Sequence, residues 1–359
     1  MLAALALSLH GRLPAETPTS APALVQAFMT EFSVPGMQVS FRRGATALWD
    51  GCFGEADRSG HRAVKPDSLF RIASDSKAFT AAAILLLVED GRMHLQDRIF
   101  APGGVLHQFA VLGLQPEWLN VVTVHQLLTH TCGGWDNSGD DPMFERPGLD
   151  HDQLIAWTLR THPLQHPPGE KYAYSNFGYC LLGRVIERIG GLPYPQFVRE
   201  HVLRPAGIHD MRIGTHRAAP NEVHYYGQDD GDPYGIPIFR MDSHGGWIAT
   251  AADLSRFMAC LFSPKDPEGA LPILQSESLS VMTTGTTANP GYGCGLAVNR
   301  VGNAWHSGSL PGTMSLMVHT QSGMSWAAVL NTRSPAEGAA LRLDRMLWQI
   351  AQSVPDWVA

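Results

Sequence analysis

Apolar and polar residues follow two different rhythms along the chain. Alternating runs predict short strands near both ends, at 37–43, 46–54, 293–300, 304–306, 314–319 and 326–330. Apolar residues at helical spacing predict helices at 24–32, 123–130, 151–160, 176–190, 195–203, 251–262 and 336–351. A further helix, opened by the stretch RIASDSK, is predicted to continue through the apolar segment 78–88 and to end near Asp90-Gly91.

The order of these elements predicts an α/β (α+β) fold. Because strands come from both ends of the chain and helices fill its middle, we expect an antiparallel sheet flanked by helices and built from both termini, with an inserted all-helical lobe. The first two strands are predicted to form a hairpin around residues 43–45. The expected boundaries are 21–95 together with 240–359 for the α/β lobe, and 96–239 for the helical lobe.

The composition of the 359-residue chain is that of a globular protein. Hydrophobic residues make up 44% and charged residues 16%, which is enough to bury the core of one large two-lobed unit or of two domains. A net charge of −7 and an isoelectric point of about 6.1 argue against a nucleic-acid partner. The five cysteines form no Cys-x-x-Cys pair and the motif His-Glu-x-x-His is absent, so the sequence indicates no disulfide framework, no metal and no cofactor.

The first residues, MLAALALSLHG, form an apolar run about as long as the core of a signal peptide. Residues 1–20 therefore suggest either the remnant of a signal peptide or an N-terminal extension with a plain helix. The remaining sequence contains no apolar run of the ~18 residues that a transmembrane helix needs.

The first candidate site is Ser74-Asp75-Ser76-Lys77, at the start of the predicted helix 78–88. A serine there can simply cap the helix. Alternatively, Lys77 can activate Ser74 as a nucleophile, because positions three apart share one face of a helix. Burial and the positive end of the helix would both favour the neutral amine that a base requires, and the backbone N–H of Ser74 could help to bind an oxyanion.

The second candidate is Tyr174-Ser175-Asn176, at the start of the predicted helix 176–190. A phenol whose pKa is lowered by a nearby ammonium can act as a base or proton shuttle, and the amide of Asn176 can bind a substrate carbonyl. The simpler interpretation is an ordinary tyrosine followed by an asparagine that caps the helix.

The third candidate is the stretch 306–309, which follows the short predicted strand 304–306. Gly308 would let a substrate approach the strand closely, and the N–H of Ser309 could complete an oxyanion hole opposite Ser74. His306 would then line the site. His244 also fits the pattern His-x-Gly, but it precedes a predicted helix and could simply be a loop histidine.

The three motifs in this order resemble those of the penicillin-recognising serine hydrolases, a superfamily of class C β-lactamases, DD-carboxypeptidases, D-aminopeptidases and family VIII carboxylesterases. The stretches VPGMQVSF, LLTHTCGG, PPGEKYAYSNFGYCLLGRVIE and GWIATAADLSRF are similar to that superfamily as well, so the resemblance covers about 24 to 350. It implies that Ser74 is acylated and that Lys77 and Tyr174 share the proton transfers. It also implies that Asn176 and His306 contact the substrate.

One position differs from class C β-lactamases, which usually carry Lys-Thr-Gly where this chain has His306-Ser307-Gly308. A histidine is mostly neutral near pH 7, so we expect weaker recognition of anionic substrates. The resulting hypothesis is a carboxylesterase or D-amino-acid-type peptidase working through an acyl-enzyme on a small-molecule substrate. The alternatives are a class C-like β-lactamase or DD-carboxypeptidase, and a catalytically silent binding protein.

The resemblance and the apolar start point toward the periplasm or secretion, with a cytoplasmic location as the alternative. The sequence does not indicate the oligomeric state. The motif Gly-x-Ser-x-Gly of the α/β-hydrolases is absent.

Overall fold

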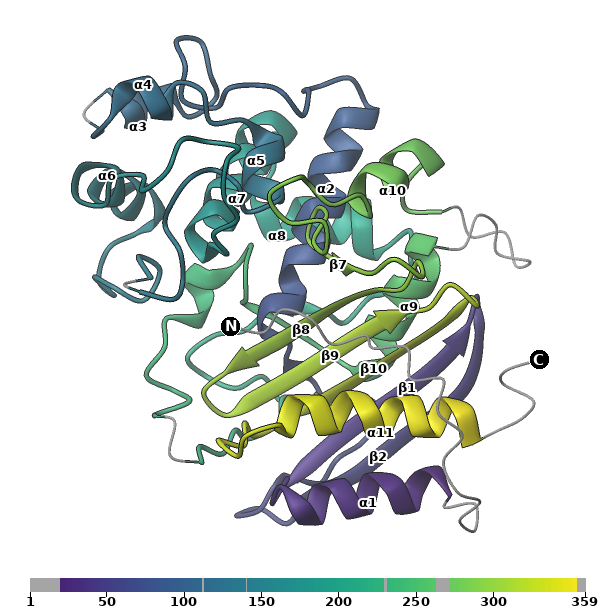
Figure 1. Ribbon diagram of the computed structural model, residues 1–359. Helices are drawn as coiled ribbons and strands as arrows, with labels where there is room; N and C mark the ends of the chain where they lie inside the picture. The colour runs from purple at the N-terminus through teal and green to yellow at the C-terminus, as the bar shows by residue number, and fades with distance from the viewer. Residues whose placement is uncertain (1–19, 112, 140, 229–230, 263–271, 354–359) are drawn as a thin grey trace.

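A seven-stranded antiparallel sheet forms the centre of the fold in this computed structural model (Figure 1). The structure describes residues 20–111, 113–139, 141–228, 231–262 and 272–353, so the predicted segment 1–20 lies almost entirely outside the described residues. Across the sheet the strands are β3 (Arg62–Ala63), β2 (Thr46–Asp57), β1 (Gly36–Arg43), β10 (Met324–Leu330), β9 (Thr313–His319), β8 (Ala304–Leu310) and β7 (Ala297–Val298).

The two ends of the chain meet in the middle of this sheet. Strand β1 pairs antiparallel with β10, from Met37 opposite Leu330 to Arg43 opposite Met324. On its other side β1 forms the predicted hairpin with β2. The expected fold class, an antiparallel sheet built from both termini and flanked by helices, is therefore confirmed.

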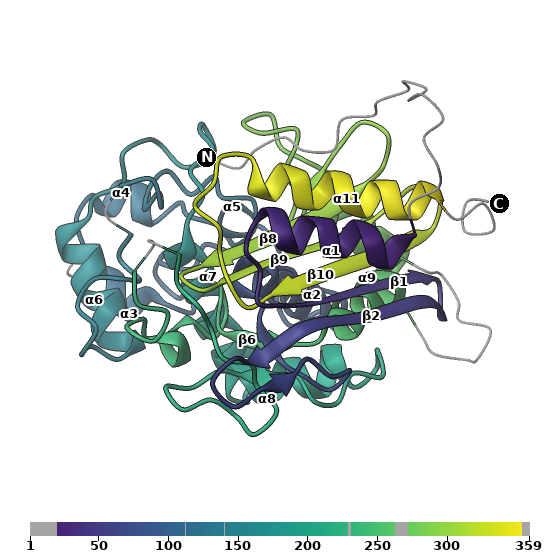
Figure 2. The same cartoon turned by 90° about the horizontal axis from the view of Figure 1, so that it is seen from below.

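The period-two pattern of the strands directs alternate residues to two different layers. Met37, Val39 and Phe41 pack against α1 (Ala21–Glu31) and α11 (Ala339–Ser353), which lie side by side on one face (Figures 1 and 2). On the opposite face Ser40 forms a 2.7 Å hydrogen bond with Ser255 of α9 (Ala251–Phe262). The sheet is thus covered on both faces, which explains why nearly all of β1, β9 and β10 is buried.

Helix α2 (Ser76–Glu89) is the buried element on which the site is built. The segment Ala78–Leu85 is buried throughout, because α7 (Asn176–Gly190), α8 (Tyr194–Val198) and α10 (Ser276–Met282) contact this helix. The other helices are α3 (His107–Ala110), α4 (Pro116–Leu119), α5 (Val124–Leu128) and α6 (His151–Thr161). The 3-10 turns are η1 (Ala73–Asp75) and η3 (Ile238–Met241), and η2 (Arg199–Leu203) is a π-helix. The division into lobes at 96 and 239 stays a prediction.

Several predicted elements occur with altered bounds. The helices 176–190 and 251–262 are confirmed, and Thr250 caps the latter by accepting a 3.0 Å hydrogen bond from the backbone N–H of Asp253. The predicted strand 293–300 is wrong over most of its length, since only Ala297–Val298 is extended. A second sheet of β4 (Phe70–Arg71), β6 (Trp247–Ala249) and β5 (Arg212–Ile213) was not predicted, because strands this short carry no periodic signal.

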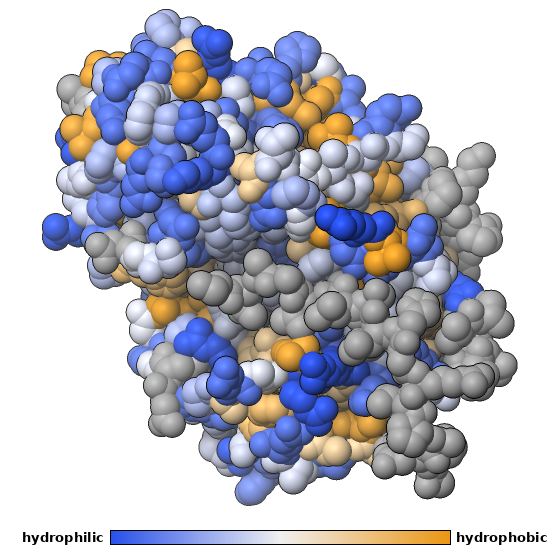
Figure 3. Space-filling view, in the orientation of Figure 1, coloured by the Kyte–Doolittle hydropathy of each residue, from blue (hydrophilic) through white to orange (hydrophobic). Residues whose placement is uncertain are grey.

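The described surface is mainly polar on the face shown in Figure 3, with apolar residues scattered over it. Within the described ranges, no helix has the length and apolar character needed to span a bilayer.

Candidate active site

Ser74 lies in a strained turn rather than inside the helix that follows. It is the middle residue of η1, and Ala73 before it has a φ of 45°, a left-handed conformation that costs an alanine about 1–2 kcal/mol. The turn carries no side-chain cap, so the interpretation of Ser74 as an N-cap is not supported. Its hydroxyl instead faces Lys77 and Tyr174. Strain of this kind is typical of positions that a functional site requires.

The ammonium nitrogen of Lys77 contacts three oxygens. It lies 3.1 Å from Oγ of Ser74, 2.7 Å from Oδ1 of Asn176 and 3.0 Å from the carbonyl oxygen of His244. The side chain is completely buried, and burial lowers the pKa of Lys77 from 10.5 to about 7. Asp141 and Asp75 partly oppose this shift through their negative charges.

These contacts direct the lone pair of a neutral Lys77 amine at Ser74. The carbonyl oxygens of Asn176 and His244 can only accept hydrogen bonds, so both N–H groups of a neutral Lys77 are directed at them. Its lone pair is then left facing the Ser74 hydroxyl, which can donate. With its pKa lowered to about 7, Lys77 is available in the neutral form, the form able to take the serine proton, near neutral pH.

The phenol of Tyr174 interacts with the Ser74 side chain. The Lys77 nitrogen also lies 4.7 Å from the centre of its ring. Burial raises the pKa of the Tyr174 phenol, so the expectation of a lowered phenol pKa is wrong. The buried neutral phenol is therefore suited to passing a proton on, whereas Lys77 is the better resting base.

Asn176 begins α7 but does not cap it. The cap is Ser175, whose hydroxyl accepts a hydrogen bond from the backbone N–H of Gly178. The amide of Asn176 faces Lys77 through Oδ1 and donates through Nδ2 to Asp141, at 2.7 Å. The alternative interpretation of Asn176 as a helix cap is thus excluded by the structure.

His306, Gly308 and Ser309 all lie on one strand, since β8 extends to Leu310 rather than ending at His306 as predicted. A side chain at Gly308 would meet the carbonyl oxygen of Ile72 at 2.0 Å. The glycine is therefore explained by close packing of β8 against the turn that carries Ser74, and not by the approach of a substrate.

The backbone of Ser309 faces the open edge of β8. Leu310 pairs with Thr313 across a two-residue turn, which makes Ser309 a position whose N–H points away from β9. On the other side β7 pairs only with the first two residues of β8, Ala304 and Trp305. The N–H of Ser309 is thus directed to the side of the strand that β7 leaves uncovered.

His306 belongs to a chain of buried ring contacts. Nδ1 of His130 accepts the backbone N–H of Ser175, so its Nε2 carries the proton and faces the Tyr292 hydroxyl at 3.3 Å. That hydroxyl can then donate to Nε2 of His306, 3.2 Å away. The remaining N–H of His306 is directed at Ser307 O (2.9 Å) and lies 3.6 Å from the buried carboxylate of Asp75.

His244 does not take the place of His306. Its ring is completely buried, and in the described structure neither ring nitrogen has a hydrogen-bond partner. It contributes its backbone carbonyl to Lys77 and precedes β6 rather than a helix.

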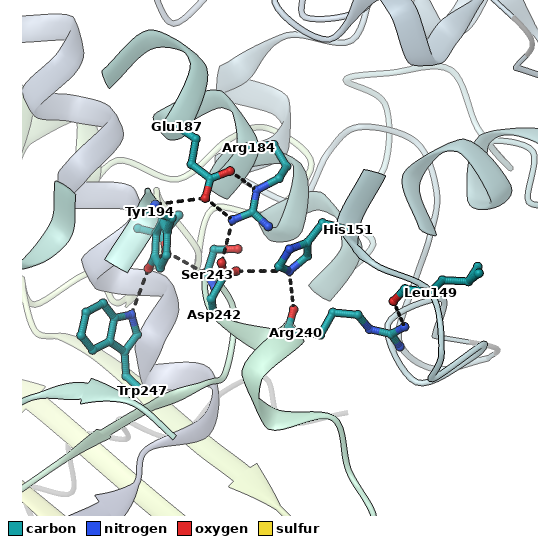
Figure 4. A network of polar contacts seen from close by, with 10 residues as sticks. Leu149, His151, Arg184, Glu187, Tyr194, Arg240, Asp242, Ser243 and Trp247 are labelled. Carbon is teal, nitrogen blue, oxygen red and sulfur yellow. Dashed lines mark hydrogen bonds and ion pairs between the residues drawn. The ribbon is translucent and has the colours of Figure 1, made fainter. Parts of the chain in front are cut away.

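A network of charged groups fixes the turn that carries this carbonyl (Figure 4). Asp242 forms a 2.6 Å ion pair with Arg184 and lies 3.7 Å from His151. His151 in turn contacts the carbonyl oxygen of Arg240 at 2.9 Å. Helices α6 and α7 therefore hold the residues just before His244.

Four residues of this arrangement were not among the sequence candidates, namely Asp75, His130, Asp141 and Tyr292. Asp75 and His130 lie inside stretches that the sequence singled out, SDSK and LLTHT. Asp141 and Tyr292 lie in loops and belong to no motif.

The chain has the fold that β-lactamases and transpeptidases share, and Ser74, Lys77 and Tyr174 are placed together on it. The family model for Beta-lactamase matches residues 21–348, and the chain belongs to this family.

Individual relatives support the same assignment. "Penicillin-binding protein 4*" of Bacillus subtilis (strain 168) is 32% identical over 191 residues, which cover 51% of this chain and 39% of the relative. "Protein flp" of Staphylococcus aureus (strain MW2) is 25% identical over 313 residues, or 86% of this chain and 61% of the relative. The chain thus spans about two fifths to three fifths of the length of these curated relatives.

A solved structure is similar over nearly its full length. The D-amino acid amidase from Ochrobactrum anthropi SV3 superposes with a TM-score of 0.74 at 25% identity, covering 92% of this chain and 99% of the amidase.

Proposed function

We propose that this protein is a serine hydrolase that forms an acyl-enzyme on Ser74. The observation that carries the proposal is the contact of the Ser74 hydroxyl with Lys77, a buried lysine whose pKa is lowered to about 7. A neutral amine with its other hydrogen bonds directed elsewhere is the activating base that a serine needs.

The reaction then proceeds in two halves. Lys77 takes the proton of Ser74 while Oγ attacks the substrate carbonyl, and the N–H groups of Ser74 and Ser309 stabilise the oxyanion. Tyr174 passes the proton to the leaving alcohol or amine, and the acyl group remains on Ser74. Water then attacks the acyl-enzyme by the reverse route, which releases the acid and returns the proton to the serine.

The substrate class that we propose is a carboxylic ester or a D-amino-acid-type amide. Support comes from His306 at the position where class C β-lactamases usually carry lysine, and from the similarity to a D-amino acid amidase. The alternative is a class C-like β-lactamase or DD-carboxypeptidase, which the similarity to a penicillin-binding protein favours. A silent binding protein is the third reading, and the lowered pKa of Lys77 argues against it.

The test is a comparison of purified wild type and Ser74→Ala on p-nitrophenyl esters, D-amino-acid p-nitroanilides and nitrocefin. We expect turnover of esters or D-amino-acid anilides that disappears in Ser74→Ala. Turnover that survives the substitution would refute the proposed nucleophile. Efficient turnover of nitrocefin alone would replace the proposed substrate class with the β-lactam alternative.

A further inference from the structure

We propose that Asp141 is a positioning residue of the reaction, because it sets which end of the Asn176 amide faces Lys77. This inference rests on the proposed function. It adds a residue from a loop of the helical region to the serine, lysine and tyrosine of the motifs.

The geometry places Asp141 one hydrogen bond behind Asn176. Oδ2 of Asp141 accepts from Nδ2 of Asn176 at 2.7 Å, and the Oδ1 atom of the same amide lies 2.7 Å from Lys77. The neighbouring Asn137 accepts the backbone N–H of Asn176 at 2.8 Å. Two side chains of one loop therefore fix both the backbone and the side chain of Asn176.

The chemistry of these groups explains why the amide has a defined direction. An ionised carboxylate can only accept hydrogen bonds, so Asn176 must turn its NH₂ group toward Asp141. Its oxygen is then forced toward Lys77. If the amide were reversed, its N–H would occupy the lone pair of Lys77 that the proposed mechanism reserves for Ser74.

Asp141 is itself held in place. Its Oδ1 accepts the backbone N–H of Met143 at 2.9 Å, and the carbonyl oxygen of Met143 accepts from the buried guanidinium of Arg240 at 2.7 Å. Arg240 binds three more carbonyl oxygens of the same loop, those of Glu145, Arg146 and Leu149. The loop is thereby anchored to the turn that precedes His244, part of which is visible in Figure 4.

The charge of Asp141 acts on Lys77 as well. It is the largest influence that raises the pKa of Lys77 against the effect of burial. The titratable groups that face Lys77 are Asp75, His130, Asp141, Tyr174, Tyr179 and His244. Of these, the two aspartates are the groups that stabilise its ammonium form.

The test uses the rate at which a fluorophosphonate labels Ser74 as a function of pH, measured on the full chain. In Asp141→Asn one of the two acceptor oxygens becomes an NH₂ group, so the side chain can no longer accept from both Met143 N–H and Nδ2 of Asn176. The Asn176 amide then loses its fixed direction toward Lys77. We expect the midpoint of the labelling profile to fall by about one pH unit, at the low end for the loss of a nearby opposite charge. The plateau rate should fall about ten- to a hundredfold, as for a lost hydrogen bond to a charged group.

Two further variants separate positioning from a structural role. Asp136→Asn makes the same change in the same loop and should label like wild type. Within the described residues its carboxylate accepts a hydrogen bond only from the backbone N–H of Ser138. The double variant Asp141→Asn with Asn176→Asp restores a donor facing an acceptor at both contacts. Its plateau rate should recover at least tenfold over Asp141→Asn, with a midpoint above that of wild type, because a carboxylate now touches Lys77.

The outcomes are distinct. An unmoved midpoint in Asp141→Asn, or a double variant as slow as the single one, overturns the role of Asp141 while Ser74 remains the labelled residue. Absence of labelling at Ser74 in wild type overturns the proposed function instead. Thermal unfolding of each variant confirms that it is folded before its profile is compared.

Discussion

The buried Lys77 should make the folded protein more stable as the pH rises above 7. Its pKa falls from 10.5 to about 7 on folding. Between these two values the unfolded chain binds more protons at this lysine than the folded chain does. The free energy of unfolding therefore rises with pH across this window, because protonating the lysine favours the unfolded state.

The size of the effect follows from the two pKa values. One pH unit inside the window is worth about 1.4 kcal/mol for one proton, and half saturation near pH 7 reduces the first unit. From pH 7 to pH 9 we expect Lys77 to contribute a gain of about 2 kcal/mol to the free energy of unfolding. Lys77→Met should abolish this gain. The oxygens that Lys77 contacts lose their partner in this variant, which lowers the free energy of unfolding by about the same amount at each pH. This loss therefore does not change how the free energy of unfolding varies with pH.

The assay is urea unfolding of wild type and Lys77→Met at several pH values between 7 and 9. The quantity compared is the difference in unfolding free energy between the two proteins, which should change by about 2 kcal/mol across the range. Lys65→Met replaces an exposed lysine and should keep the slope of wild type. A difference between wild type and Lys77→Met that does not vary with pH would refute the lowered pKa, and with it the proposed base.

Three other expectations concern the remaining site residues. Lys77→Ala and Tyr174→Phe should each lower kcat at least ~100-fold, and the double variant should be little worse than the slower single one; an unchanged kcat in Tyr174→Phe would make the tyrosine structural. His306→Lys should raise the ratio of kcat/KM for nitrocefin over p-nitrophenyl butyrate about ten- to a hundredfold, because an ammonium can bind a substrate carboxylate; an unmoved ratio would show that His306 does not set this selectivity. Gly308→Ala should lower the unfolding free energy by about 1–3 kcal/mol, since its new carbon would overlap the carbonyl of Ile72; urea unfolding indistinguishable from wild type would contradict that packing.

The fold and the motif residues were predictable because their signals are local. Ser74 and Lys77 are three residues apart at a helix start, and Tyr174 lies two residues before Asn176, which begins an amphipathic helix. The spacing of three across the start of the helix brings Lys77 back toward Ser74. Tyr174 and Asn176 were predictable because they form one short motif. That the sheet combines strands from both ends of the chain was predictable from where the strand patterns lie.

The remaining features depend on contacts between distant segments. Strand β8 was predicted too short because its buried positions include His306 and Gly308, which do not register as apolar. The raised pKa of Tyr174 arises from burial, and a sequence shows neighbours along the chain but not burial in the fold. Asp141 reaches Lys77 through Asn176, from a loop whose position is set by Arg240, almost a hundred residues later. Pattern along the chain carries no information on such contacts.

The most direct test of the account is to locate the covalent adduct itself. A fluorophosphonate should phosphonylate the wild-type protein once, and digestion followed by mass spectrometry should place the adduct on Ser74. The same treatment of Ser74→Ala should leave the protein unmodified. An adduct on Ser76 or Ser309, or undiminished labelling of Ser74→Ala, would contradict the claim that Ser74 is the nucleophile.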